Sequence, residues 1–160
     1  MSGELLLRSA RPADHAAILA LAAEAFRSNS FTAALVARFG ELEALEPTEL
    51  VRSGITERLA SEGTTLVAEL NGQLVGFVMT ECNAARSTGG IPVLAVEAAH
   101  RRIGVGRAMI DAALAQFRER GLRYARIETL ATNEASQRLF VRAGFAEFAR
   151  EVQFFRRLDP

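Results

Sequence analysis

Three arginines and two glycines stand close together in the segment Arg101-Arg102-Ile103-Gly104-Val105-Gly106-Arg107. A short apolar run at residues 91–96 precedes it, and apolar residues with helical spacing follow from Val105, so the pattern predicts a strand, a glycine turn and a helix start. Glycine lets the backbone approach a ligand closely, and the free amides of a first helical turn supply donors and partial positive charge. With guanidinium groups beside them, these amides are typical of a phosphate-binding turn.

An ordinary connection between a strand and a helix would use glycines in the same way, so the segment alone leaves both interpretations open. Two common phosphate-binding loops are excluded. The Walker pattern requires a lysine, and the chain contains none, while the dinucleotide pattern requires a third glycine where Met109 stands. The segment therefore indicates a different phosphate-bearing ligand.

The chain's 160 residues suffice for one substantial core, so we expect a single domain over residues 1–160. Its 19 acidic and 19 basic residues balance, which removes the positive field that drives nonspecific binding to nucleic acid, and no nucleic-acid partner is expected. His15 and His100 are far apart and lack companion ligands, so no metal site is expected.

Cys82 is the only cysteine, which rules out an internal disulfide and fits a reducing cytoplasm. The N-terminus lacks a basic start and a long apolar stretch, and no later run approaches about 18 uninterrupted apolar residues. We therefore expect a cytoplasmic protein with no membrane partner.

Periodicity and turn residues predict a mixed α/β chain. Expected strands cover residues 4–8, 64–70, 73–82, 91–96 and 124–130, with a polar loop at 83–90 and terminal strands within 145–158. Expected helices follow Asp14 and Thr48 as caps, occupy one or two short stretches in 27–47, and cover 104–121 and 133–143. Asn71-Gly72 predicts a hairpin, and Pro92 predicts interrupted strand pairing.

A second segment, from Asn133 to Phe145, follows the glycine turn by one expected strand. Together, the two segments resemble the GNAT family of N-acetyltransferases. The first signature of that family, Arg/Gln-x-x-Gly-x-Gly/Ala after a bulged strand, is filled by Arg101, Gly104 and Gly106. The second is matched by Asn133, Leu139, Gly144 and Phe145, and the opening is similar at Arg11, Asp14 and Ile18. The resemblance spans most of the chain.

The resemblance implies a GNAT-like α/β fold: a mostly antiparallel central sheet of six or seven strands, flanked by helices on both faces and splayed between the fourth and fifth strands. It also implies acetyl-coenzyme A as cosubstrate, with no metal. The pyrophosphate would bind the amides of the turn, and the pantetheine arm would pair with the splayed strand. The implied coenzyme-binding residues are Leu94, Ala95, Val96, Arg101, Arg102, Ile103, Gly104, Val105, Gly106, Arg107, Asn133, Ser136 and Phe140.

Acetyl transfer to an amine requires a neutral amine, a polarised thioester carbonyl and a tolerated thiolate. Several members of the family carry a carboxylate on the strand before the second signature, and Glu128 stands there as candidate general base. The alternative for Glu128 is a strand carboxylate paired with Arg126. Glu81 and Glu97, near strand ends, are the next candidates.

Phe140 stands where the family commonly has a tyrosine that protonates the leaving thiolate. Phenylalanine cannot donate a proton, whereas a thiol of pKa about 8.5 leaves acceptably as an anion near neutral pH. The resemblance thus implies an acetyl-coenzyme A dependent N-acetyltransferase, an acyltransferase that acts by direct attack. The alternative is a noncatalytic domain on the same fold that binds or senses acyl-coenzyme A.

The implied acceptor is a primary amine of a small molecule, or a peptide or protein N-terminus. Its pocket is expected from residues 27–62, the 83–90 loop and the terminal strands. The family often pairs subunits through terminal strands or helices, so a homodimer through Phe148, Phe154 and Phe155 is one option, with ordinary core packing as the other.

Overall fold

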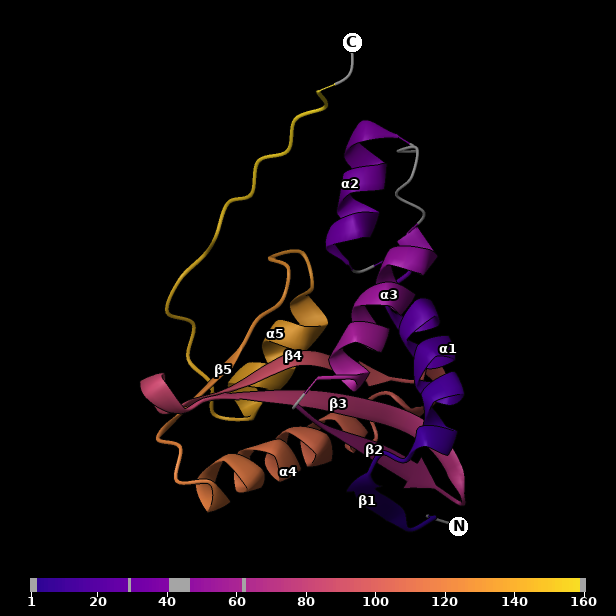
Figure 1. Ribbon diagram of the computed structural model, residues 1–160, viewed down its shortest axis with the longest axis vertical. Coiled ribbons are helices and arrows are strands. Elements are labelled where there is room, and N and C mark those ends of the chain that lie inside the picture. The colour runs from indigo at the N-terminus through magenta and orange to yellow at the C-terminus, as the bar shows by residue number, and fades with distance from the viewer. Residues whose placement is uncertain (1–2, 29, 41–46, 62, 159–160) are drawn as a thin grey trace.

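The computed structural model describes residues 3–28, 30–40, 47–61 and 63–158. In this part of the chain, five strands form one sheet in the order β1-β2-β3-β4-β5 (Figure 1). Neighbouring strands from β1 to β4 are antiparallel, whereas β4 and β5 are parallel and are joined through a helix. The strands are β1 Leu5–Ser9, β2 Thr64–Leu70, β3 Gln73–Asn83, β4 Thr88–Val96 and β5 Tyr124–Ile127.

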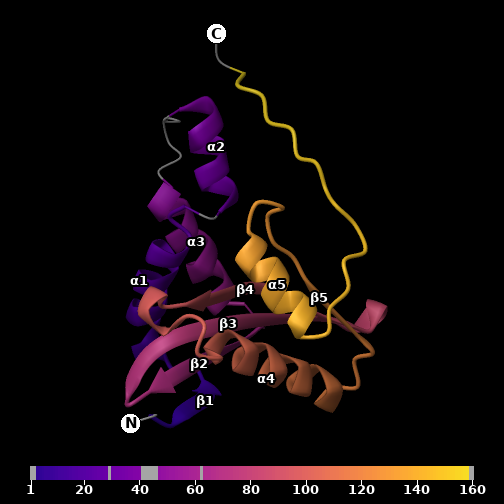
Figure 2. The same ribbon diagram turned by 180° about the vertical axis from the view of Figure 1, so that it is seen from behind.

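Helices cover both faces of the sheet (Figures 1 and 2). One helix, α4, packs on one face, and α1 and α3 pack on the other. The helices are α1 His15–Ala25, α2 Phe31–Phe39, α3 Pro47–Leu59, α4 Val105–Glu119 and α5 Glu134–Arg142. One short helix predicted within 27–47 is α2, while residues 29, 41–46 and 62 lie outside the described residues.

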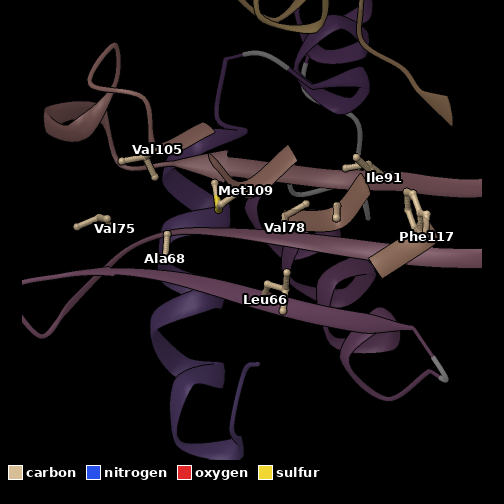
Figure 3. Close-up of a cluster of buried hydrophobic side chains, with 9 residues drawn as sticks. Leu66, Ala68, Val75, Val78, Ile91, Val105, Met109 and Phe117 are labelled. Atoms are coloured by element: carbon tan, nitrogen blue, oxygen red, sulfur yellow. The ribbon is translucent and has the colours of Figure 1, made fainter. Parts of the chain in front are cut away.

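Two buried apolar clusters hold the helices to the sheet. The cluster on the α4 face comprises Leu66, Ala68, Val75, Val78, Ile91, Val105, Met109, Ala113 and Phe117 (Figure 3). The cluster on the other face comprises Ile18, Ala22, Ile55, Val67, Phe77, Met79, Val93 and Ala95. Successive strand residues point to opposite faces, so Leu66 and Ala68 face α4 while Val67 between them faces α1. Both clusters include β4 residues and therefore fix the strand that leads into the glycine turn.

The fourth strand, β4, carries one extra residue relative to β3. Met79 pairs with Val93, and Glu81 pairs with Gly90. Two residues of β4, Ile91 and Pro92, therefore lie opposite the single residue Thr80 of β3. Proline has no backbone N–H to donate to the ladder. The predicted interruption at Pro92 is therefore confirmed, and the strand before the glycine turn is bulged.

The parallel strands β4 and β5 pair over only part of β4. Pairing runs from Thr88 with Tyr124 to Ile91 with Ile127, where β5 ends, and β4 continues to Val96. The two strands therefore part after Ile91, which is the expected splay between the fourth and fifth strands. A mixed, mostly antiparallel sheet with helices on both faces confirms the predicted fold class.

The strands differ from the sequence prediction in three places. The end of the predicted 83–90 loop belongs to β4, and β5 ends at Ile127 instead of residue 130. Residues 145–158 form no strand, so the described sheet has five strands where six or seven were expected. A strand needs a neighbour to take its backbone hydrogen bonds, and no strand of the described sheet lies beside this segment (Figure 1).

Asp14 precedes α1, as predicted, but its side chain does not cap that helix. Its carboxylate instead accepts hydrogen bonds from the Arg8 guanidinium at 2.7 and 2.9 Å and from the Arg11 N–H at 2.7 Å. Arg8 also contacts the Glu69 carboxylate and so joins β1 to β2. The hydrogen bonds that Asp14 accepts, those from Arg8 most strongly, lower its pKa from 3.8 to about 2.

We expect Asp14→Asn to lower the free energy of unfolding at pH 7 by about 1–3 kcal/mol, because it removes charge-assisted hydrogen bonds. The folded pKa lies below the unfolded one, so this stabilisation is complete above the ordinary pKa of 3.8 and is lost as the pH falls toward 2. Urea unfolding at neutral and acidic pH measures both effects. Asp111→Asn, which removes an exposed ion pair, should cost less than about 1 kcal/mol, and equal losses from the two variants would contradict the assignment.

The described residues contain no helix with the length and apolar character needed to cross a bilayer. Within the same residues, no group of three or more His, Cys, Asp or Glu side chains could hold a metal ion. Cys82 is exposed, and its Sγ accepts a hydrogen bond from Arg120 Nη1 at 3.2 Å.

Candidate functional site

The predicted phosphate-binding segment is a tight turn between β4 and α4. One turn of 3-10 helix follows β4, and α4 begins at Val105 with Gly104 as its N-cap. Gly104 has a φ of 98°, in the left-handed region, and a Cβ built there would have no neighbour within 4 Å. Gly104 is therefore required for the backbone conformation of the turn and not for close packing. Arg102 also has a positive φ, 66°, which is uncommon outside glycine.

The start of α4 offers a row of unpaired backbone donors. The first hydrogen bond of the helix runs from the Ala108 N–H to the Gly104 carbonyl at 3.0 Å. Within the described chain, the N–H groups from Arg102 to Arg107 have no acceptor. Unpaired amides at a helix N-terminus carry partial positive charge and bind anions. The turn can therefore hold a phosphate group.

The arginines of the segment differ in their charge partners. Arg101 Nε donates to the Val96 carbonyl at 3.1 Å, which ties the turn to the end of β4. Arg107 Nε lies 2.9 Å from the Asp111 carboxylate, one helical turn away. Arg101 and Arg102 have no carboxylate partner among the described residues. Two positive charges therefore remain beside the free amides, whereas the charge of Arg107 is balanced.

Gly106 brings α4 against α5. A Cβ at Gly106 would lie 3.1 Å from Leu139 Cδ2, a tight contact, and 3.7 Å from Val96 Cγ2, an ordinary one, so a larger residue would push against α5. Arg107 Nη1 also donates to the Arg142 carbonyl at the end of α5, at 2.6 Å. The two sequence segments that carried the resemblance are therefore in direct contact. Gly106 serves the packing of that contact, a role that differs from that of Gly104.

The N-terminus of α5 is fixed by its own side chains. Asn133 is the N-cap, and its Oδ1 accepts from the Ser136 N–H at 3.2 Å. Gln137 Nε2 donates to the Ala131 carbonyl at 2.7 Å, which holds the loop between β5 and α5. Asn133 and Ser136 are half-buried. Asn133 therefore has a structural role as a helix cap whatever else it contacts.

Phe140 is half-buried at the C-terminal part of α5. Its ring meets that of Phe145 edge to face, with centroids 6.4 Å apart, and its carbonyl accepts from the Phe145 N–H at 3.0 Å. Phe145 in turn packs against the cluster on the α4 face. Phe140 is therefore held by aromatic packing at the junction of α5 with the core.

The end of β4 presents an unpaired backbone edge. The Glu97 N–H donates to the Val75 carbonyl of β3 at 2.8 Å. Backbone groups of alternate residues point to opposite sides of a strand, so those of Ala95 also face β3, and those of Leu94 and Val96 face the side where β5 has ended. Because the Val96 carbonyl already accepts from Arg101 Nε, an extended ligand can pair with the backbone of Leu94 and with the Val96 N–H.

Glu128 directly follows β5, at the point where β4 and β5 part. Its side chain is 69% exposed, and its Oε2 accepts from Arg126 Nη2 at 2.6 Å. The ion pair with Arg126 that the sequence offered as an alternative role is present. An exposed pair of this kind contributes about 0–1 kcal/mol to stability, so the fold does not depend on Glu128.

The other two candidate carboxylates have partners of their own. Glu97 Oε2 lies 2.7 Å from His100 Nδ1 in the 3-10 turn after β4. Glu81 Oε2 lies 3.3 Å from Arg58 Nη1 of α3. A Cβ at Gly90 would lie 2.9 Å from Glu81 Oε1, so the Glu81 side chain reaches across Gly90 toward β5.

Glu81 and Glu128 lie on the same face of the sheet. Glu81 is in register with Gly90, and Gly90 is in register with Arg126 of β5, two residues before Glu128. The contact with Arg58 identifies this face as the one that α3 covers. A row of alternating charge therefore crosses the sheet on the α3 face; we call it the charged row, and its members are Arg58, Glu81, Arg126 and Glu128.

A small pocket opens at the Glu81 end of the charged row, beside the β4 bulge. It is lined by Arg58, Ser61, Gly63, Thr64, Thr65, Met79, Thr80, Glu81 and Pro92. Sequence reasoning missed Arg58 and Gly90, because Arg58 is 23 positions from Glu81 and only the strand register brings the row together. It also missed the pairing of Arg107 with Asp111, which spacing of four on a helix could have indicated.

Comparison with known proteins gives a family match over most of the chain. A model of the acetyltransferase (GNAT) family matches residues 16–145, which include both motif segments. A mycothiol acetyltransferase of Cellulomonas flavigena is 35% identical over 98 residues, 56% of this chain and 28% of that protein. The match thus spans less than a third of that relative's own length.

Solved structures share the fold. The aminoglycoside N-acetyltransferase AAC(6')-Iy in complex with CoA matches with a TM-score of 0.72 at 17% identity, covering 99% of this chain and 97% of that chain. A ribosomal-protein-alanine N-acetyltransferase from Brucella melitensis matches with a TM-score of 0.66 at 26% identity, covering 90% and 86%. The family match, with both of its motif segments in contact at Gly106, shows that this chain belongs to the acetyltransferase (GNAT) family.

Proposed function

We propose that this protein is an N-acetyltransferase that moves an acetyl group from acetyl-coenzyme A to a primary amine by direct attack. The observation that carries the proposal is that the free amides at the start of α4 lie next to the end of β4, where β5 no longer pairs; the bond from Arg101 Nε to the Val96 carbonyl joins the two. A ligand with a phosphate group and an extended arm fits both features. The family match supports the transfer of an acetyl group.

Acetyl-coenzyme A is the cosubstrate, as in the family to which the chain belongs. Its pyrophosphate would accept hydrogen bonds from the amides between Arg102 and Arg107, with the unpaired charges of Arg101 and Arg102 nearby. Its pantetheine arm contains amides that would pair with the backbone of Leu94 and with the Val96 N–H. Half-buried Asn133 and Ser136 would border the arm from α5.

The reaction needs one proton removed and one bond broken. The amine nitrogen attacks the thioester carbonyl, a base takes the ammonium proton, and the carbon–sulfur bond breaks to release a thiolate. We propose Glu128 as the base, directly or through water, since this exposed carboxylate stands where β4 and β5 part. Solvent can then protonate the thiolate, because a thiol of pKa about 8.5 leaves acceptably near neutral pH.

The proposed acceptor is a primary amine of a small molecule, or a peptide or protein N-terminus. The similar proteins are named for mycothiol, an aminoglycoside and a ribosomal-protein alanine, so this range includes both small-molecule and protein acceptors. The charged row and the pocket at Glu81 favour a polar acceptor approaching on the α3 face. The coenzyme would then reach the splay between β4 and β5 from the glycine turn, and the acceptor would reach it from the α3 face.

A thiol-release assay over a panel of amines tests this proposal. Amino sugars, polyamines and short peptides with free N-termini are incubated with acetyl-coenzyme A and the protein, and mass spectrometry identifies the acetylated product. We expect coenzyme A release that depends on at least one amine. Calorimetric binding of acetyl-coenzyme A without release for any amine would contradict acetyl transfer.

A noncatalytic domain that binds or senses acyl-coenzyme A is the second candidate. One observation favours it: Phe140 offers no proton to a leaving thiolate and is packed against Phe145. Positioned acid catalysis typically contributes 10²–10⁴-fold, so its loss could leave a binding protein in place of an enzyme.

We expect Phe140→Tyr to raise kcat by less than about tenfold and to change the dissociation constant for acetyl-coenzyme A by less than about twofold, because the thiolate already leaves without an acid. Steady-state kinetics and calorimetry measure the two quantities. Phe145→Tyr, which adds a hydroxyl to the neighbouring ring, is the matched control and should give no gain in kcat. Binding without turnover in both the parent and the Phe140 variant would support the sensor.

A further inference from the structure

One end of the molecule carries a local excess of arginine. Residues 82–88 and 118–124 together contain four arginines and one acidic residue, Glu119, whereas the whole chain is formally neutral. Figures 1 and 2 both show the short turn between β3 and β4 at the same end of the fold as the last turn of α4. We call this group of side chains the arginine end, and its members are Arg86, Arg118, Arg120 and Arg123.

Hydrogen bonds hold these two stretches of chain together. The Arg123 N–H donates to the Ser87 carbonyl at 3.0 Å, and Ser87 directly follows Arg86. Arg120 Nη2 donates to Thr64 Oγ1 at the start of β2, at 2.9 Å. The arginine end is therefore a fixed part of the fold, built from the β3–β4 turn, the end of α4 and the start of β5.

The charges of the arginine end are not balanced. All four residues are exposed, and among the described residues none of the four has a carboxylate partner. Arg118 and Arg120 stand at the C-terminal end of α4, where the helix dipole favours positive charge. Arg86 and Arg123 lie outside α4, so the dipole does not account for them. Positive charges held near one another repel, and an anionic ligand would remove that repulsion.

An exposed aromatic ring lies beside these guanidinium groups. Tyr124 is 61% exposed, and the guanidinium carbon of Arg123 lies 5.8 Å from the centroid of its ring. Guanidinium groups bind carboxylates through two parallel hydrogen bonds, and an open ring offers a contact for an aromatic side chain. Nucleic acid fits less well, because its binding draws on the neutralisation of many phosphates, on the order of 6–10, and the formally neutral chain adds no wider positive field.

We infer that the arginine end is a docking surface for an acidic peptide segment of a partner protein, with carboxylates of the segment on the guanidinium groups and an aromatic side chain against Tyr124. The 15 residues of α4 separate this surface from the glycine turn by about 20 Å. A segment bound there would leave the coenzyme site open and would hold the protein on its partner. The inference goes beyond the proposed acetyl transfer and does not depend on it.

Fluorescence anisotropy with a labelled polyglutamate peptide that contains one tryptophan tests the docking. Excess coenzyme A is present throughout, so that the glycine turn does not bind the probe. We expect saturable binding that weakens as salt is added. The double variant Arg86→Gln with Arg123→Gln should bind the probe at least about tenfold more weakly, because two charge-assisted contacts are lost. Urea unfolding of the same variant shows whether it is folded.

Two controls separate this surface from overall charge. Arg27→Gln with Arg52→Gln removes the same charge after α1 and within α3, and should bind the probe within about twofold of the parent. Tyr124→Ser should weaken binding of the tryptophan peptide by about twofold to tenfold and leave binding of plain polyglutamate unchanged. No saturable binding by the parent, or an equal loss in the two double variants, would overturn the inference. A labelled RNA that binds more tightly than the peptide would also overturn it and would assign the surface to nucleic acid.

Discussion

Glu128→Gln is expected to lower kcat by about 10²–10⁴-fold and to leave the dissociation constant for acetyl-coenzyme A within about twofold of the parent value. Glutamine keeps the size of the side chain but cannot take a proton from the amine. Because Glu128 is 69% exposed and its ion pair is a surface pair, the fold should survive the change. Kinetics with the best amine of the panel and calorimetry with the coenzyme separate the loss of chemistry from a loss of binding.

Three further variants test whether Glu128 acts as a general base or only as the partner of Arg126 in an ion pair. Arg126→Gln removes the partner of Glu128 and should reduce kcat by less than about tenfold, since an exposed pair contributes little. Glu81→Gln and Glu97→Gln test the other two carboxylates, which have partners of their own in Arg58 and His100. An Arg126 variant as inactive as the Glu128 variant would assign the loss to the ion pair, and a large loss at Glu81 or Glu97 alone would move the base there.

Local signals predicted the fold well. The Asn71-Gly72 turn, the strand entering the glycine turn and the helix after it are each encoded within about a dozen residues, and all are present. The same holds for Asn133, whose predicted helix start is a helix cap. Where chemistry and geometry are contained in one short stretch, the sequence is sufficient.

Contacts between residues that are far apart in the sequence could not be predicted from local patterns. Asp14 has the residue type and position of a helix cap, but its carboxylate accepts hydrogen bonds from Arg8 and does not cap α1. This outcome depends on how β1 packs beside α1, which the sequence does not show. The C-terminal segment, residues 145–158, has the period of a strand, but period does not say which edge it pairs with. In the structure the segment pairs with no strand of the described sheet, and four of its large apolar side chains, those of Phe148, Val152, Phe154 and Leu158, are exposed.

The candidate site shows the same division. Sequence spacing indicated a turn for a phosphate and named Glu128, Glu81 and Glu97 separately. The register of β3, β4 and β5 brings Glu81 and Glu128 onto one face with two arginines, and it leaves Glu97 in a local pair with His100. The two glycines of the motif have different physical roles: Gly104 adopts a positive φ, and Gly106 leaves room for Leu139 of α5. These differences become visible only when the strands and helices are packed together.

Gly106→Val is expected to weaken coenzyme binding by about fivefold to a hundredfold, because its side chain would press against Leu139 of α5. A Cβ alone would lie 3.1 Å from Leu139 Cδ2, so the two further methyl groups of valine would force Leu139, and with it the contact between α5 and the turn, to shift. Overpacking of this kind costs about 1–3 kcal/mol, which is up to about a hundredfold in a dissociation constant if the displaced turn must be restored on binding. Calorimetry with coenzyme A and urea unfolding measure how the cost divides between affinity and stability.

Leu139→Ala should rescue the Gly106 variant, since it removes the methyl groups that the valine meets. We expect the double variant to bind coenzyme A more tightly than Gly106→Val alone, with a coupling of about 0.5–3 kcal/mol. Gly104→Ala is the matched control. Alanine at this position is strained by the positive φ, but its Cβ meets no atom within 4 Å, so Leu139→Ala should not restore binding to this variant. Equal rescue of both glycine variants, or of neither, would mean that Gly106 acts on the ligand directly and that its contact with α5 does not set the shape of the turn.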